Sequence, residues 1–121
     1  MKITCGTDII EVERIKDSIE KYGDKFLLHV FTESEIKYCD TKKNKYQHYA
    51  VRFAGKEAIY KAISEELKKD KIQWNEIEIF SNDGKKPIVN LLKKVDSVEQ
   101  IDISLSHIKE YAIANCIAII K

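Results

Sequence analysis

Four charged side chains lie among small and apolar residues in the stretch VRFAGKEAIYKA, residues 51–62: Arg52, Lys56, Glu57 and Lys61. A carboxylate among cations is suited to bind Mg²⁺ while the cations bind phosphate groups that share the metal, because Mg²⁺ is usually held by one or two carboxylates, phosphate oxygens and water. Alternatively, these side chains form the solvated face of a helix. In that case Glu57 and Lys61, at i and i+4, contribute only about 0.2–0.5 kcal/mol to its stability.

A second carboxylate, Asp8, lies between a glycine and two isoleucines in the segment GTDII. An acid in such apolar surroundings is either hydrogen-bonded locally, as in an Asx-type cap, or held for a metal ion. Asp8 and Glu57 would together supply the two carboxylates of a magnesium site if the fold brings them together.

Other polar residues could also have a purely structural role instead of a functional one. His107 in LSHIKEYAIA is either a hydrogen-bonded residue of a strand or a functional group, and Ser106 lacks the G-x-S-x-G context of a nucleophile. The segment NDGKKP (82–87) is typical of a hairpin turn with solvated lysines. It lacks the further glycines and the following helix of a phosphate-binding loop.

The elements that position these residues follow from hydrophobic periodicity and from capping and turn signals. We expect a first strand over KITCGTDII with a break at Gly6, helices over 12–22 and 46–69, and a helix start at Thr32 with a capping box to Glu35. Further strands are expected over 76–80, 88–92, 101–107 and 111–120, the last buried on both faces.

The long helix has a face of small residues that could pack closely against a sheet, made of Val51, Ala54, Gly55, Ala58 and Ala62. Helices early in the chain and strands late predict an α+β fold, with a mainly antiparallel sheet packed against the long helix.

The composition limits the classes of protein to which this chain could belong. The 121 residues are long enough for one domain, residues 1–121, with a core that needs no disulfides. A net charge of +1 predicts no general attraction to nucleic acid or membrane, although Lys42–Lys61 holds six basic residues and one acid. Three cysteines without metal-like spacing, and no signal peptide or membrane-length apolar run, predict a cytoplasmic protein in which Cys116 simply packs.

Five segments occur in the order seen in one family: GTDIIEVERI, FTESEIKYC, RFAGKEAIYKA, GKKP and SLSHIKEYAIA. From Ile3 to Ala118 the chain resembles the holo-acyl-carrier-protein synthases, the small bacterial 4′-phosphopantetheinyl transferases. The resemblance implies that a serine of apo-acyl carrier protein receives the 4′-phosphopantetheine group of coenzyme A, in support of fatty acid biosynthesis. It also implies release of adenosine 3′,5′-bisphosphate, Mg²⁺ as the cofactor, the family's α+β fold, and a homotrimer with sites between subunits.

The resemblance also implies roles for individual residues. Asp8 and Glu57 would be the magnesium ligands, with Glu57 and Lys61 catalytic and Lys61 beside the pyrophosphate. The base is either Glu57 or a metal-bound water that Glu57 orients. The groups expected on coenzyme A are Arg52, Lys56, Lys61, Gly84, Pro87 and His107. Arg14 would face the acidic carrier protein. Lys21 and Lys25 are expected to contact the carrier protein as well, only because they are positively charged.

Two departures from the family pattern stand out. Gly55 occupies a position where alanine is expected, which costs the helix up to about 1 kcal/mol. The turn G-K-K-P is one residue longer than the usual G-x-P, so that either Lys85 or Lys86 could contact coenzyme A.

Two other functional classes are compatible with parts of this pattern. A magnesium-dependent nuclease could use the same carboxylates, and a nucleic-acid-binding module could use residues 42–61 alone. No basic channel interleaved with aromatic residues is evident, and we therefore expect no nucleic-acid partner and no membrane partner.

Overall fold

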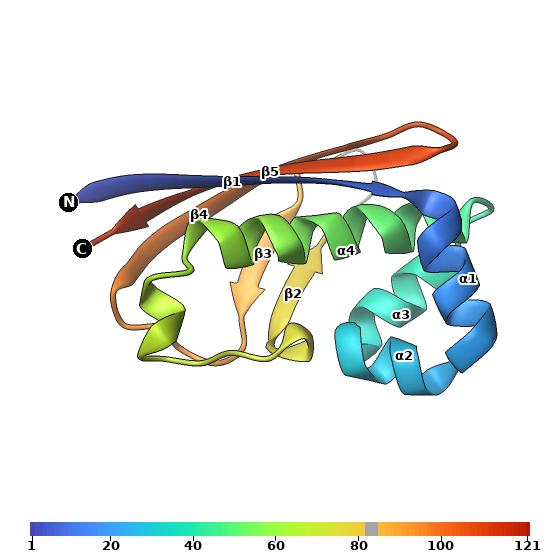
Figure 1. The fold of residues 1–121 in the computed structure, drawn as a ribbon, viewed down its shortest axis with the longest axis horizontal. Coiled ribbons are helices and arrows are strands. Elements are labelled where there is room, and N and C mark those ends of the chain that lie inside the picture. The colour runs from blue at the N-terminus through green and yellow to red at the C-terminus, as the bar shows by residue number, and fades with distance from the viewer. Residues whose placement is uncertain (82–84) are drawn as a thin grey trace.

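The computed structural model describes residues 1–81 and 85–121, which form both helices and β-strands (Figure 1). The helices are α1 (Val12–Tyr22), α2 (Asp24–Val30), α3 (Glu33–Asp40) and α4 (Lys45–Ala62), with short 3₁₀ turns η1 (Glu66–Lys68) and η2 (Trp74–Glu76). The strands are β1 (Lys2–Glu11), β2 (Ile77–Phe80), β3 (Ile88–Leu91), β4 (Val98–His107) and β5 (Tyr111–Ile120).

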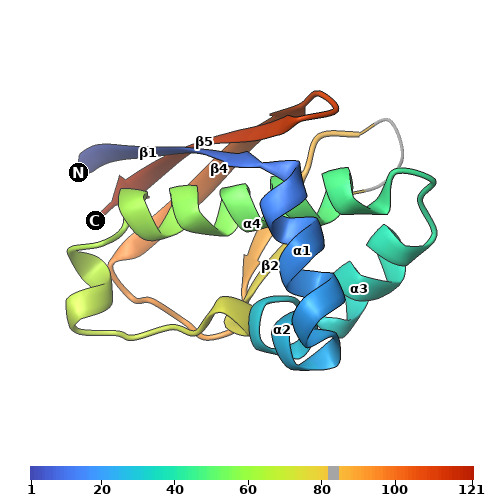
Figure 2. The same cartoon turned by 45° about the vertical axis from the view of Figure 1, so that its right-hand side comes forward.

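All strand pairs among the described residues are antiparallel. One sheet has the order β1-β5-β4, and β2 and β3 form a second, two-stranded sheet. Lys2 lies opposite Ile120, which places the two ends of the chain side by side (Figure 1). The long helix α4 packs along the three-stranded sheet, while α1, α2 and α3 gather at one end of α4 (Figure 2). The predicted α+β fold, with a mainly antiparallel sheet against a long helix, is confirmed.

The close packing of α4 on the sheet depends on its small residues. Ala54, Ala58 and Ala62 are buried in the main core, as the sequence predicts. Strand β1 crosses α4 at Gly6, where an added Cβ atom would lie 2.1 Å from the carbonyl oxygen of Ala58. The prediction of a break at Gly6 is wrong, because β1 runs through this position. The glycine is needed there because the two backbones are close.

Gly55 is explained in the same way. A Cβ atom at this position would lie 2.5 Å from Cδ1 of Ile79 and 3.1 Å from Cδ1 of Ile103. The small helix face therefore meets large side chains of β2 and β4, and the helix propensity lost at Gly55 is offset by this packing.

Three features of the secondary structure differ from the sequence-based prediction. Helix α2 was not predicted; it has only seven residues, of which Val30 is buried and Phe26 and Leu27 are partly buried against the same core. Helix α4 ends at Ala62 rather than residue 69, since the chain turns back to bring Ile72 into the core, where the Tyr60 hydroxyl donates to the Ile72 carbonyl at 2.6 Å. Strand β5 is buried on one face only, and its alternate residues lie on the outer face of the sheet.

Other local predictions are confirmed. Thr32 begins α3 with a capping box, in which its hydroxyl accepts from the Glu35 amide at 3.2 Å and the Glu35 carboxylate accepts from the Thr32 amide at 2.8 Å. Cys116 is buried in the core, and Cys5 and Cys39 are also free thiols. Within the described residues, no helix combines the length and the apolar character needed to cross a membrane.

Candidate active site

Asp8 and Lys61 meet where β1 crosses α4. The Lys61 ammonium donates to the Thr7 carbonyl at 2.8 Å and to Oδ1 of Asp8 at 3.1 Å. The Asp8 side chain is 17% exposed and that of Lys61 is 53% exposed, so the pair lies at the surface with the carboxylate partly shielded. Gly6, two residues earlier on the same strand face, allows the approach that creates this contact.

Glu57 precedes Lys61 by one helical turn and is half-buried. Its pKa is raised above the ordinary value, chiefly by burial and then by the Asp8 carboxylate, while Lys61 opposes the shift. Asp8 and Glu57 line one hollow of about 300 Å³ together with Arg14. The structure therefore brings Asp8, Glu57, Lys61 and Arg14 together.

The two carboxylates fit a magnesium ion. They line one hollow, and a bound cation would relieve the repulsion by Asp8 that, after burial, raises the pKa of Glu57. Within residues 1–81 and 85–121, no group of three or more acids, histidines or cysteines is arranged to hold a metal. Two carboxylates suit Mg²⁺, which usually takes its other ligands from water and substrate phosphates.

The hollow also contains residues that the sequence analysis missed. Ser18 lies one turn after Arg14, and Phe53 lies one turn before Glu57. Phe26 stacks on Phe53 with ring centroids 6.4 Å apart and completes an apolar wall. The i, i+4 spacing to predicted site residues was the available signal for Ser18 and Phe53.

Arg52 and His107 belong to a second cluster. The Arg52 guanidinium lies 4.4 Å from the centroid of the Tyr38 ring, and its Nη1 donates to the His48 carbonyl at 3.3 Å. The His48 and His107 rings are 5.5 Å apart. Arg52 is 2% exposed, and its Nε is buried without a hydrogen-bond partner among the described residues. The cluster lies on a different flank of α4 from Glu57, and the lining of the first hollow includes neither Arg52 nor His107.

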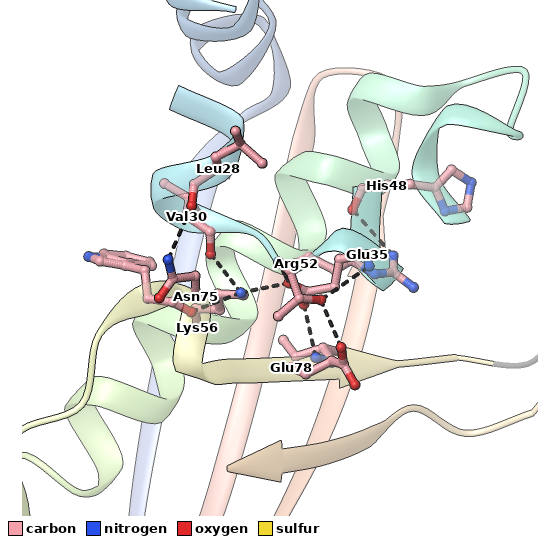
Figure 3. A network of polar contacts seen from close by, with 11 residues as sticks. Leu28, Val30, Glu35, His48, Arg52, Lys56, Asn75 and Glu78 are labelled. Atoms are coloured by element: carbon pink, nitrogen blue, oxygen red, sulfur yellow. Dashed lines mark hydrogen bonds and ion pairs between the residues drawn. The ribbon is translucent and has the colours of Figure 1, made fainter. Parts of the chain in front are cut away.

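The predicted role of Lys56 needs correction. Its ammonium is inaccessible to solvent and donates three hydrogen bonds, to Oε1 of Glu35 at 2.7 Å and to the carbonyls of Val30 at 2.7 Å and Trp74 at 3.0 Å (Figure 3). A phosphate cannot reach an ammonium that is buried with all its protons engaged. Lys56 is therefore removed from the candidate coenzyme A ligands.

Glu35 completes this buried network. Besides Lys56, its carboxylate accepts from the amides of Thr32 and Ile79, at 2.8 and 2.9 Å (Figure 3). The ion pair therefore joins the end of α2, the start of α3, α4 and β2 in one set of satisfied hydrogen bonds. The capping box predicted the local bond of Glu35, but no pattern pointed to its partner 21 residues away.

The remaining predicted residues lie outside the first hollow. Lys21 and Lys25 are exposed on α1 and α2. Pro87 is half-buried just before β3, and Gly84 lies outside the described residues. Of the two turn lysines, Lys86 forms an ion pair with Asp102 at 2.6 Å.

Comparisons with known proteins agree with the fold. Residues 4–116 match the 4′-phosphopantetheinyl transferase superfamily. The chain is 47% identical to the holo-[acyl-carrier-protein] synthase of Ruminiclostridium cellulolyticum, over 94% of this chain and 90% of the relative. It also resembles the crystal structure of a holo-(acyl-carrier-protein) synthase from Bacillus anthracis in complex with CoA, with 30% identity and a TM-score of 0.76 over 95% of this chain and 94% of that one.

A second solved structure, that of the Helicobacter pylori holo-[acyl-carrier-protein] synthase in complex with coenzyme A, has 27% identity and a TM-score of 0.80. It covers 94% of this chain and 98% of that one. The α+β fold of this chain is that of these two synthase structures. The chain belongs to the 4′-phosphopantetheinyl transferase superfamily.

Proposed function

We propose that this protein transfers the 4′-phosphopantetheine group of coenzyme A to a serine of an apo-acyl carrier protein, with Mg²⁺ as cofactor, in the cytoplasm. The observation that carries the proposal is that Asp8 and Glu57 line one hollow and Lys61 is paired with Asp8, in a chain 47% identical to a holo-[acyl-carrier-protein] synthase. Such a transfer supplies the carrier proteins of fatty acid biosynthesis.

The proposed reaction is a single phosphoryl transfer. The carrier serine oxygen forms a bond to the phosphorus that bears pantetheine, and the bond from that phosphorus to the bridging oxygen of the pyrophosphate breaks. Adenosine 3′,5′-bisphosphate leaves with the bonding electrons. A magnesium ion held by Asp8 and Glu57 would offset the negative charge of the phosphates.

The side chains have distinct tasks in this proposal. The serine proton would pass to Glu57 or to a water that Glu57 orients, a contribution of typically ~10²–10⁴-fold. Lys61, held beside Asp8, places a positive charge where the leaving bisphosphate gains charge. Arg14, which lines the same hollow, would meet the acidic carrier protein.

We further propose that the functional unit is a homotrimer of single-domain chains. Arg52 and His107, the candidate ligands of the coenzyme A nucleotide, lie apart from the hollow that holds Asp8 and Glu57 in the same chain. A neighbouring subunit could bring the two groups together. The outer face of the three-stranded sheet supports this assembly, because it exposes Ile3, Ile9 and Ile117.

The activity is tested by intact-mass spectrometry of an apo-acyl carrier protein incubated with the purified protein, coenzyme A and Mg²⁺. The expected result is a gain of one phosphopantetheine group that disappears when the metal is chelated. An unchanged carrier mass, with a carrier that a known synthase does modify, would contradict the proposal.

The same assay tests the metal ligands. We predict that Glu57→Ala abolishes transfer while circular dichroism remains that of the unaltered protein, because the half-buried side chain can be truncated without opening the core. Glu65→Ala, which removes an exposed carboxylate paired with Lys68, is the matched control and should retain full turnover. Wild-type turnover by Glu57→Ala would remove the metal-site assignment.

A further inference from the structure

The cluster around Arg52 and His107 contains a buried cation that the described residues do not fully satisfy. Arg52 is 2% exposed, and its guanidinium donates one described hydrogen bond, from Nη1 to the His48 carbonyl at 3.3 Å (Figure 3). Its Nε atom is buried without a partner in the described part of the chain. Several N–H groups of Arg52 therefore remain available to a ligand.

Burial gives this lack of partners a meaning that it does not have at the surface. An exposed ammonium is hydrated and needs no partner in the protein, whereas a buried guanidinium has lost its water. The equally buried Lys56 donates three hydrogen bonds, one of them to the Glu35 carboxylate. Among residues 1–81 and 85–121, no carboxylate pairs with Arg52 in this way. An anionic ligand would supply the missing partner.

The aromatic ring of Tyr38, on α3, holds Arg52 from one side. The ring centroid lies 4.4 Å from Cζ of Arg52 and 4.6 Å from Nζ of Lys42, distances at which a π face attracts a cation. The same ring therefore gathers two cations that would otherwise repel each other. The His48 ring lies 5.9 Å from the Tyr38 ring and 5.5 Å from that of the exposed His107.

Tyr38 is itself fixed, because α3 is anchored at both ends. The capping box at Thr32 fixes the start of the helix. At its end, the Tyr49 hydroxyl donates to Oδ1 of Asp40 at 2.7 Å, and the Thr41 hydroxyl donates to the Tyr38 carbonyl at 2.7 Å. A ring held in this way presents its two cations in a defined arrangement before any ligand arrives, which lowers the cost of binding.

The position of the cluster indicates which anion it binds. Coenzyme A carries a pyrophosphate and a separate 3′-phosphate on the ribose. In the proposed reaction the pyrophosphate lies at Asp8, Glu57 and Lys61. Arg52 and His107 do not line that hollow and lie on another flank of α4. The phosphate that remains for them is the 3′-phosphate.

We propose that Tyr38 is a positioning residue of the coenzyme A site, whose ring holds Arg52 and Lys42 together so that both bind the 3′-phosphate. This inference rests on the proposed function, which supplies coenzyme A as the ligand. Tyr38 acts through the two cations and not through its hydroxyl group. Loss of the ring should therefore weaken the recognition of one phosphate and leave the rest of the ligand bound as before.

The test measures two Kd values by isothermal titration calorimetry with Mg²⁺ present, for coenzyme A and for 3′-dephospho-coenzyme A. The variants of the full chain are Tyr38→Leu, which removes the ring, and Tyr38→Phe, which keeps it. Tyr22→Leu is the matched control. Tyr22 also lies under a lysine, with Nζ of Lys21 5.3 Å from its ring centroid, but it is 54% exposed at the end of α1.

We expect the unaltered protein to bind coenzyme A about tenfold or more tightly than the dephosphorylated form, as charged hydrogen bonds to one phosphate would give. Tyr38→Leu should reduce this preference to less than about threefold, by raising the Kd for coenzyme A alone. Tyr38→Phe and Tyr22→Leu should keep the full preference. The KM for carrier protein should be the same in all four proteins.

Three outcomes would overturn the inference. Equal weakening of both ligands by Tyr38→Leu would show a general structural role of the ring. Loss of the preference in Tyr38→Phe would assign the effect to the hydroxyl group. Absence of any preference in the unaltered protein would show that this cluster binds no 3′-phosphate.

A second pair of variants keeps the test decisive if Tyr38→Leu does not fold. Lys42→Gln should lower the preference for coenzyme A about as far as Tyr38→Leu, and Lys43→Gln, at the exposed neighbouring position, should leave it unchanged. Equal effects of the two substitutions would overturn the inference. Failure of the proposed function is recognised separately, as the absence of phosphopantetheine transfer by the unaltered protein. Failure of the present inference alone is normal transfer, with a preference for the 3′-phosphate that these substitutions do not change.

Discussion

Lys56 and Glu57 are adjacent in sequence, yet their surroundings differ in kind. The Lys56 ammonium is enclosed by Glu35 and two carbonyl oxygens, whereas Glu57 faces the hollow beside Asp8. Burial lowers the pKa of Lys56, and the Glu35 carboxylate opposes that shift. A buried ion pair of this kind is costly to break, because removal of one partner leaves the other charge uncompensated.

We predict that Lys56→Met lowers the free energy of unfolding by about 3–5 kcal/mol, since Glu35 would remain buried without its cation. Urea denaturation followed by circular dichroism measures this loss. Lys61→Met, on the same helix but half-exposed, should change stability by less than about 1 kcal/mol. Similar small effects of both substitutions would show that the Lys56–Glu35 pair does not hold the surrounding segments together.

Glu57 gives a prediction about pH. Because its pKa in the folded protein is raised above the ordinary 4.5, the folded state keeps the proton over a range in which the unfolded state loses it. Stability linked to Glu57 is therefore lost as pH rises through its folded pKa. In the presence of a chelator, Glu57→Gln should have a higher Tm than the unaltered protein at pH 7 and the same Tm near pH 4. A Tm difference that does not change with pH would argue against this linkage.

At the scale of elements, the site depends on how closely β1 approaches α4. Asp8 and Lys61 can form their 3.1 Å contact because the strand crosses the helix at a glycine. The small residues of α4 make the same approach possible from the helix side. The geometry of the carboxylates is therefore a consequence of backbone packing.

We predict that Gly6→Ala destabilises the protein by about 2 kcal/mol or more, because the new methyl group would overlap the backbone of α4. Transfer activity should fall further than stability alone explains, since Asp8 would be moved away from Glu57. Cys5→Ala is the control, because Cys5 is exposed on the outer face of the same strand. Thermal melts and turnover at a temperature well below each Tm separate the two effects.

At the scale of the whole molecule, the three-stranded sheet is covered by α4 on one face only. The other face exposes several large apolar side chains, among them Ile3 at 70%, Ile9 at 63% and Ile117 at 54%. An apolar surface of this extent on a small protein is typical of an interface. The proposed trimer would cover it.

We predict that Ile113→Lys combined with Ile117→Lys converts the trimer to a 14.1 kDa monomer in sedimentation velocity and abolishes transfer, while the far-ultraviolet circular dichroism is unchanged. Both positions lie on the outer face of β5, so the core is untouched. Transfer by a monomeric variant would show that one chain contains a complete site. A single-chain species in the unaltered protein would contradict the trimer itself.

The sequence alone determined much of this protein, because several of its signals are local. The capping box at Thr32, the small face of the helix that became α4 and the α+β order of elements depend on spacings of a few residues, which backbone geometry converts directly into structure. The order of five motifs indicated the family. The candidate carboxylates were recognised in the same way, as residue types within short patterns.

Only the tertiary structure decided which charges face the solvent. A helical wheel places Lys56 on one flank of the helix, but it cannot reveal that Glu35 covers that flank. Likewise, Asp8 and Lys61 are 53 residues apart, and their contact exists because a glycine lets two backbones approach. Long-range packing sets the burial and the partners of each charge, and neither is encoded in the spacing of neighbouring residues.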